Sequence, residues 1–143
     1  MSDYIDLTLE SNDIKLLVTD QGDGTYKLSV DTEQTPIITS LTRVTGTKAS
    51  SGDNTVISGP GSGNRLVVTF FLIQNESSTA TTLLLKDGSD TKFRVLCQNQ
   101  GDGLVRDLPV NREWRLAENS ALVLNLSGAN SCGYSVEYYT EAV

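Results

Sequence analysis

The stretch Leu66–Asn75, with the sequence LVVTFFLIQN, is the strongest indication of the fold in this chain. Apolar residues fill both alternating sets of positions from Leu66 to Ile73, and only Thr69 interrupts them. Successive residues of a strand point to opposite sides of a sheet, so a strand of this composition is apolar on both sides. We therefore expect Leu66–Ile73 to be a central strand with protein on either side of it.

Short strand-like segments separated by turn residues continue from this stretch at the spacing of about 8–12 residues that is typical of sandwiches and barrels. Leu122, Leu124 and Leu126 form one apolar face of the segment before the last, and no amphipathic helix pattern is present. The expected strands are Asn54–Ser58, Leu66–Asn75, Ala80–Lys86, Lys92–Cys97, Gly103–Leu108, Glu113–Leu116, Ala121–Ser127 and Tyr134–Thr140. Such a series predicts an all-β fold of two packed antiparallel sheets.

The N-terminal part has the same alternating pattern. Three short segments alternate apolar with polar residues, around Ile5–Leu9, Ile14–Val18 and Tyr26–Val30, and polar turns separate them. They predict a β-meander. Residues 36–43 suit either a strand or a short helix, and Val44–Asn64 is rich in Gly, Ser and Thr, which is typical of a linker or long loop. We expect residues 1–50 to form an N-terminal meander or arm and residues 51–143 to form the sandwich.

Composition excludes several functions. The chain has 143 residues, 15 Ser, 16 Thr, two Cys and no His, with a net charge of −7. Without His, a Ser-His-Asp triad, a Cys-His pair and an imidazole metal site are all impossible. Two isolated Cys cannot form a four-Cys zinc site or a CxxC redox pair. The acidic charge opposes binding to nucleic acid and to anionic membranes. We expect no catalytic residues, no cofactor and no metal.

The compartment follows from the same features. The N-terminus MSDYIDLTLE lacks a basic start and an apolar run, so we expect no signal peptide and synthesis in the cytoplasm. Cys97 and Cys132 each lie in or beside an expected strand. Buried free thiols are the first interpretation, and a Cys97–Cys132 disulfide is the alternative.

Three local patterns resemble ligand sites, but turn chemistry explains them. Gln-Gly-Asp-Gly occurs at Gln21–Gly24 and at Gln100–Gly103, without the ligand spacing of a calcium loop. Gly59–Asn64 lacks the Lys-Ser or Lys-Thr and the helix of a phosphate cradle. The acidic pairs Asp87/Asp90 and Asp102/Asp107 lie in turn-like segments, where solvated carboxylates are expected instead of a glycosidase pair.

One basic group stands out in this acidic chain. Arg106, Arg112 and Arg115 surround the only tryptophan, Trp114. Arg and Trp are favoured at the energetic centres of interfaces, so these four residues could form a partner-binding patch. The alternative is that Trp114 belongs to the core and the arginines are ordinary surface residues. Tyr138 and Tyr139 suit packing on a sheet better than stacking on a sugar.

The sequence also resembles small structural proteins of tailed-phage virions. The resemblance is carried by Leu66–Asn75 with the following Ser77–Gly88, by the endings Ala121–Leu126 and Tyr134–Tyr139, and by the phrase Asp23–Val30. It implies a jelly-roll-like antiparallel β-sandwich preceded by the N-terminal meander or arm. It also implies a head decoration (cement) protein that binds the major capsid protein on the outer shell, as a homotrimer made in the host cytoplasm. No catalytic residues are carried over.

Within this expectation, the N-terminal segment, with Tyr4, Ile5 and Leu7, is the candidate capsid-binding clamp, because an extended arm can add a strand to a partner's sheet. Linked weak contacts in a trimer would give strong avidity. An alternative is a tail or head-fibre module that binds host-surface carbohydrate through Trp114, Tyr134, Tyr138 or Tyr139. A carboxylate hydrolase is the remaining and weakest hypothesis.

Overall fold

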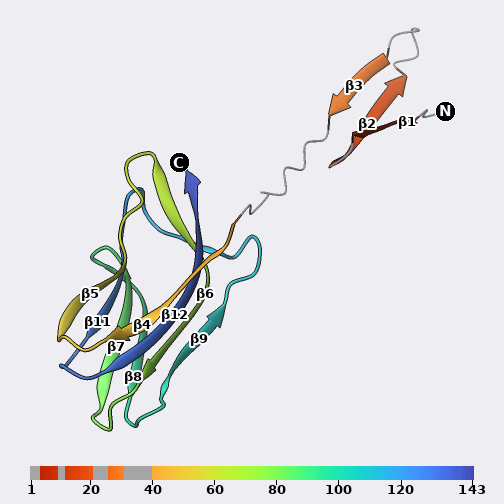
Figure 1. Ribbon diagram of the computed structural model, residues 1–143. Coiled ribbons are helices and arrows are strands. Elements are labelled where there is room, and N and C mark those ends of the chain that lie inside the picture. The colour runs from red at the N-terminus through yellow and green to blue at the C-terminus, as the bar shows by residue number, and fades with distance from the viewer. Residues whose placement is uncertain (1–3, 10–11, 21–25, 31–39) are drawn as a thin grey trace. The chain divides into compact units, whose positions relative to one another are not determined.

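The chain divides into two compact units, Met1–Ile37 and Ile38–Val143, which are described separately (Figure 1). The computed structural model describes residues 4–9, 12–20, 26–30 and 40–143. All regular structure in these residues is β-strand.

The first unit contains a three-stranded antiparallel sheet. Its strands are β1 (Tyr4–Leu9), β2 (Asn12–Asp20) and β3 (Tyr26–Val30), in the order β1-β2-β3. This confirms the meander that the alternating pattern predicts, with β1 and β3 at the two edges. The first Gln-Gly-Asp-Gly copy, at Gln21–Gly24, lies outside the described residues.

The second unit is built from two antiparallel sheets. The first contains β4 (Thr42–Lys48), β6 (Asn64–Asn75), β9 (Gly103–Asp107), β10 (Trp114–Arg115) and β12 (Cys132–Ala142). Its order is β10-β6-β12-β4, and β9 also pairs with β6. Because β12 takes one edge of β6, β9 and β10 follow each other along the opposite edge. The long apolar strand is thus central in its sheet, as predicted.

The second sheet covers one face of the first. Its strands are β5 (Gly52–Ile57), β7 (Thr81–Asp87), β8 (Asp90–Cys97) and β11 (Leu122–Leu126), in the order β5-β11-β7-β8. The chain passes from one sheet to the other at almost every connection, and β7–β8 is the only hairpin between neighbours in this sheet. These orders are the winding of a jelly roll, so the predicted jelly-roll-like antiparallel β-sandwich is confirmed.

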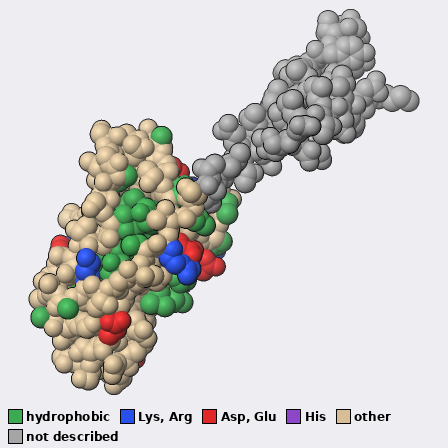
Figure 2. All heavy atoms as spheres, in the orientation of Figure 1, with side chains coloured by type: hydrophobic (Ala, Val, Ile, Leu, Met, Phe, Trp, Pro, Cys, Tyr) green, Lys and Arg blue, Asp and Glu red, His purple; other side chains and the backbone are tan. Residues whose placement is uncertain are grey.

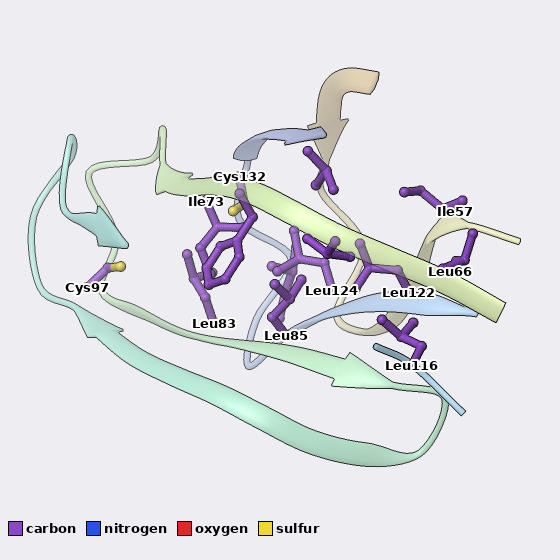
Figure 3. Packing of buried hydrophobic residues seen from close by; sticks show 14 residues of the cluster. Ile57, Leu66, Ile73, Leu83, Leu85, Cys97, Leu116, Leu122, Leu124 and Cys132 are labelled. Atoms are coloured by element: carbon purple, nitrogen blue, oxygen red, sulfur yellow. The ribbon is translucent and has the colours of Figure 1, made fainter. Parts of the chain in front are cut away.

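The core lies between the two sheets (Figure 3). Leu122, Leu124 and Leu126 face it from β11 and are at most 1% exposed, as their alternation predicts. They meet apolar residues of β6, β7 and β12 in one cluster. Its fully buried members include Leu66, Val68, Phe71, Ile73, Leu83, Leu85 and Val136. Burial of this contiguous apolar surface is the main favourable term in the folding of the unit.

The predicted linker at Val44–Asn64 is wrong. Residues 42–48 form β4, which pairs with β12 from Cys132↔Lys48 to Tyr138↔Thr42, and residues 52–57 form β5, which pairs with β11. Small Ser and Thr side chains are compatible with strands when the partner strand supplies the apolar residues. The expected boundary at residue 50 therefore falls between two strands of the second unit, which begins at Ile38.

The glycine-rich segment within that stretch is a loop, as predicted, and hydrogen bonds hold it against the loop before β11. The amide of Gly61 donates to Asn119 Oδ1 at 2.8 Å, and the amide of Gly63 donates to Glu118 Oε1 at 2.7 Å. Gly61 and Gly63 have φ of +101° and +75°, which glycine adopts without strain. The loop therefore belongs to the sandwich and does not separate two units.

Candidate functional site

The outer face of the β4-β12-β6-β9 sheet, which points away from the core, is the most distinctive surface of the second unit. Strand register defines its rows, because directly paired residues lie on the same face of a sheet. One row runs across four strands as Asp107, Phe70, Glu137 and Arg43. The next row contains Val105, Leu72, Ser135 and Thr45, and a row on the other side contains Arg115, Val67 and Tyr139.

This outer face is partly apolar. Phe70 and Leu72 are half-buried on β6, and Val105 on β9 is 56% exposed. Figure 2 shows apolar side chains gathered among charged ones on the second unit. The sequence predicted protein on both sides of Leu66–Ile73, and within the described residues the second sheet supplies it on one side only. Exposed apolar area of this kind marks interaction surfaces.

Two ion-pair groups border the apolar residues. Arg115 lies between Glu113 and Glu141, at 3.2 and 3.1 Å, and Arg65 lies 2.6 Å from Glu141. Desolvation alone would lower the pKa of Arg115, but the nearby Glu141 and Glu113 outweigh it, so that pKa is raised. These charges cover Val67, which is fully buried although it faces outward.

The second group involves Arg43 and Glu137, which are paired across β4 and β12. The Arg43 guanidinium also lies 5.8 Å from the centroid of the Phe70 ring, a cation–π distance. This pair is largely exposed on the arginine side, with 60% of the Arg43 side chain accessible. Exposed ion pairs of this kind contribute little to stability. The Arg43–Glu137 pair matters here because it forms part of the outer surface.

A hollow of about 210 Å³ opens beside these two groups. Its walls combine apolar and acidic side chains from the start of β4, the end of β9 and the loop before β10. The lining residues are Leu41, Thr69, Asp107, Leu108, Pro109, Val110, Glu113 and Glu137. Leu41 and Val110 are each more than half exposed, whereas the side chain of Glu113 is only 1% exposed.

A second hollow, also of about 210 Å³, lies further along the same edge between β6 and β9. Leu72, Leu104 and Val105 supply apolar lining, and Gln74 and the backbone of the Gly101–Gly103 turn supply polar lining. The surface along this edge of the sheet is therefore concave at two places.

The structure does not bring Trp114 and the three arginines together as one patch. Trp114 pairs with Val68 and points toward the core side, with its ring 5.2 Å from Phe93 and 6.5 Å from Phe71. Arg115, the next residue, points to the opposite face and pairs with Val67. Alternation along β10 therefore separates the two residues that are adjacent in sequence.

The other two arginines are exposed. Arg106 lies on β9 opposite Phe71, which puts it on the core side of the sheet edge, and Arg112 lies in the loop before β10. The interpretation of Trp114 as a residue that packs on the core agrees with its position, although its buried Nε1 has no hydrogen-bond partner in the described part of the chain.

Tyr4, Ile5 and Leu7 lie in β1. Register pairs Ile5 with Leu16 and Leu7 with Ile14, so these apolar residues share one face of the three-stranded sheet. Tyr4 pairs with Leu17 and belongs to the other face. Because β1 pairs only with β2 in this sheet, its second edge is a place where another strand could add.

The two cysteines are buried free thiols, as the first interpretation predicted. Cys97 ends β8 and Cys132 begins β12, and both are fully buried. Burial raises the pKa of Cys132 to about 11, and it also raises the pKa of Cys97. A thiol that resists deprotonation is a poor nucleophile, so these residues act as small apolar core residues.

Asp90 is exposed as expected for a turn carboxylate, whereas Asp87 is not solvated as predicted: its Oδ2 accepts a hydrogen bond from the amide of Ala117 at 3.0 Å, and its Oδ1 is buried without a partner among the described residues. Asp87 and Asp90 pair across the β7–β8 turn. Asp102 accepts hydrogen bonds from the amides of Gln98 and Asn99, both at 2.8 Å. The bonds from Asn99 and Gln98 lower the pKa of Asp102. In residues 40–143 no three His, Cys, Asp or Glu side chains are grouped so that they could hold a metal ion.

Sequence reasoning named Asp107 only as a solvated turn carboxylate, and it missed the other residues that line the hollow. Leu41, Glu113 and Glu137 come from three segments far apart in the chain. Glu113 and Arg115 are two residues apart in a strand-like segment, which predicts that they share a face, but nothing in that pattern marks the carboxylate of Glu113 as buried. No local pattern marks Leu41.

Comparison of the chain with protein families, curated proteins and solved structures finds no match to any of them. In the part of the chain that the structure describes, no helix is long and apolar enough to cross a membrane.

Proposed function

We propose that the protein is a head decoration protein of a tailed phage, which binds the outer capsid surface as a homotrimer and stabilises the shell. The observation that carries this proposal is the pairing of a jelly-roll sandwich with a separate N-terminal β unit. The resemblance of the sequence to virion proteins supplies the capsid as partner. In this assignment the sandwich is the external body and the N-terminal unit is the clamp.

Charge is distributed in a way that supports a clamp. Residues 1–37 contain eight acidic and two basic residues, a net charge of −6, whereas residues 38–143 contain ten acidic and nine basic residues, a net charge of −1. A small, strongly acidic unit attracts a basic surface and repels other copies of itself in solution. Such complementarity speeds the encounter with a partner and selects its orientation.

Backbone geometry supports the same role. β1 and β3 are the edge strands of a sheet that contains only three strands. A sheet of this size is near the lower limit for independent stability, and it gains backbone hydrogen bonds when a partner strand pairs with an edge. The acidic unit would thereby gain backbone hydrogen bonds to the capsid protein and hold the sandwich in place.

The carbohydrate-binding alternative depends on exposed aromatic rings. Trp114 is half-buried and lies against Phe71 and Phe93, so its ring is engaged by the protein's own core. No described aromatic side chain is both strongly exposed and placed beside a second one. Capsid decoration is therefore the better supported proposal.

The proposal is tested with undecorated capsids of the source phage. The full chain and a chain lacking residues 1–30 are mixed with capsids, and binding is measured by co-sedimentation while capsid melting is followed by calorimetry. We expect the full chain to bind and raise the capsid melting temperature, and the truncated chain to remain folded but lose binding. Undiminished binding by the truncated chain would exclude the clamp, and absence of binding by the full chain would exclude decoration.

Light scattering of the full chain tests the homotrimer. The expected mass is three times 15.4 kDa. A monomer that also binds singly to the capsid would contradict the trimer while leaving decoration intact.

A further inference from the structure

The hollow beside β9 has both apolar and acidic residues in its lining. Leu41 and Val110 form exposed apolar walls, 52% and 54% accessible, with Leu108 and Pro109 next to them. Asp107, Glu113 and Glu137 are also among the residues that line this space, and the side chain of Glu113 lies buried at its wall. An apolar wall with an acidic end suits a side chain that has an apolar stem and a positive head, which describes lysine and arginine.

The charges of this hollow do not balance. Its three carboxylates are accompanied by two guanidinium groups, because Arg43 pairs with Glu137 and Arg115 pairs with Glu113. Asp107 has no ion pair among the described residues. The lining therefore has one uncompensated negative charge, and one further cation would neutralise it.

Glu113 provides a second and independent indication. Its side chain is 1% exposed, and its Oε2 accepts a hydrogen bond from Arg115 at 3.2 Å. Its Oε1 is buried and has no hydrogen-bond partner in the described residues. A buried carboxylate oxygen without a donor costs free energy, so a ligand that brings an N–H donor to this point would be favoured.

We propose that this hollow is a socket for one lysine or arginine side chain of the protein to which the sandwich binds. The stem packs on Leu41 and Val110, and the positive head is bound by the carboxylates of Asp107 and Glu113. The inference rests on the proposed function only in naming the capsid protein as the source of that side chain. It adds a contact of the sandwich itself to the contact made by the N-terminal unit.

The first experiment compares Glu113→Gln and Asp107→Asn with Asp90→Asn as the matched control. All three remove one negative charge, but Asp90 lies in the exposed β7–β8 turn, away from the hollow. We expect both hollow variants to weaken binding to undecorated capsids by at least about tenfold, as truncation of a desolvated charge contact does, and the control to change it less than about twofold. Equal affinities for all four proteins would overturn the inference.

Weaker binding by Glu113→Gln could come from a loss of folding instead of a loss of the contact. A variant that fills the socket separates these two causes. Val110→Lys places a lysine of this protein at the exposed wall of the hollow. Because Val110 is exposed and uncharged, the substitution removes no ion pair and no core contact. We expect this variant to keep the unfolding midpoint of the parent protein in urea and to lose capsid binding as Glu113→Gln does. Normal capsid binding by Val110→Lys would contradict the socket.

A small probe separates the socket from the proposed function. The full chain is titrated with N-acetyl-arginine methylamide, and amide shifts are followed by NMR, with N-acetyl-norleucine methylamide as the uncharged control. We expect shifts at the residues that line the hollow with the arginine probe only, and their loss in Glu113→Gln. If the probe causes these shifts but the hollow variants bind capsids normally, the socket exists and the capsid protein is not its partner. If millimolar probe causes no shift, the socket is wrong.

Light scattering of the same variants identifies the other source of a basic side chain. If Glu113→Gln lowers the mass of the oligomer in solution, the side chain comes from a second copy of this protein, and the capsid assignment is wrong.

Discussion

At the scale of single residues, β11 contributes the middle of the core. Leu124 is fully buried and pairs with Leu85 of β7 and Asn54 of β5, so neighbouring strands hold it on both sides. We expect Leu124→Ala to lower the free energy of unfolding by about 3 kcal/mol, because the sheets cannot collapse into the cavity. Urea unfolding measures the difference. Leu96→Ala, at a position that is 58% exposed, is the control and should change stability by less than about 0.5 kcal/mol.

The buried thiol of Cys132 makes the stability of the fold depend on pH. Burial raises the pKa of its thiol to about 11, from an ordinary value of 9.0. The folded state therefore favours the protonated thiol, and the stability that this preference contributes is present below pH 9 and is lost as the pH rises toward 11. At pH 8 we expect neither cysteine of the folded protein to react with a thiol reagent within minutes, and both to react in urea. Rapid labelling of the folded protein would contradict this burial.

At the scale of elements, the turn at residues 98–103 explains the Gln-Gly-Asp-Gly motif that it contains. Gly101 has φ of +94°, and its amide donates to the carbonyl of Asn75 at 2.8 Å. Asp102 accepts from two turn amides, and Gly103 approaches the backbone of Ile73 so closely that a Cβ would collide with its carbonyl oxygen. Gly101, Asp102 and Gly103 thus each stabilise or permit the turn that leads into β9.

We expect Gly103→Ala to lower the free energy of unfolding by about 1–3 kcal/mol, because β9 must move away from β6 to make room. The edge that carries both hollows would be disturbed with it. Gly128→Ala is the control, since its added Cβ meets only the flexible amide end of Asn130 at 3.1 Å. Unfolding in urea compares the two, and equal stabilities would contradict the close approach.

At the scale of the whole molecule, the two units differ in charge and in content. Among the described residues, the second unit contains a core between two sheets, so we expect a chain of residues 38–143 to unfold cooperatively, with a free energy within about 1 kcal/mol of that measured for the sandwich in the full chain. Calorimetry of both chains checks this. A truncated chain without a transition would show that the sandwich needs the N-terminal unit.

The acidic charge of the N-terminal unit should make capsid binding depend on salt. The N-terminal unit has six of the seven net negative charges of the chain. If it attracts a basic capsid surface, association with capsids slows steeply as salt rises from about 50 to 500 mM, because the Debye length falls from above 10 Å to a few ångströms. Stopped-flow measurements follow the rate. A rate that does not depend on salt would contradict electrostatic attraction by this unit.

Most of the fold could be predicted because strands have a period of two residues. Alternation located the meander and the strands of the sandwich, and Leu66–Ile73 identified the central one. Val44–Asn64 was assigned to a linker or long loop, although Asn54–Ser58 within it was an expected strand, because Ser, Thr and Gly are common in both loops and polar strands. The strand character of residues 42–48 and 52–57 is decided by β12 and β11, which supply the pairing partners from distant positions in the chain.

Composition and local periodicity were sufficient for the fold class and for the chemistry that the absence of histidine excludes, but they left buried free thiols and a Cys97–Cys132 disulfide both open. Which outward residues lie next to one another depends instead on the tertiary structure. It separated Trp114 from Arg115, which a strand turns to opposite faces, and it brought Leu41, Glu113 and Glu137 to one hollow. Such a site depends on sheet register between segments far apart in the chain, and no local pattern contains that information.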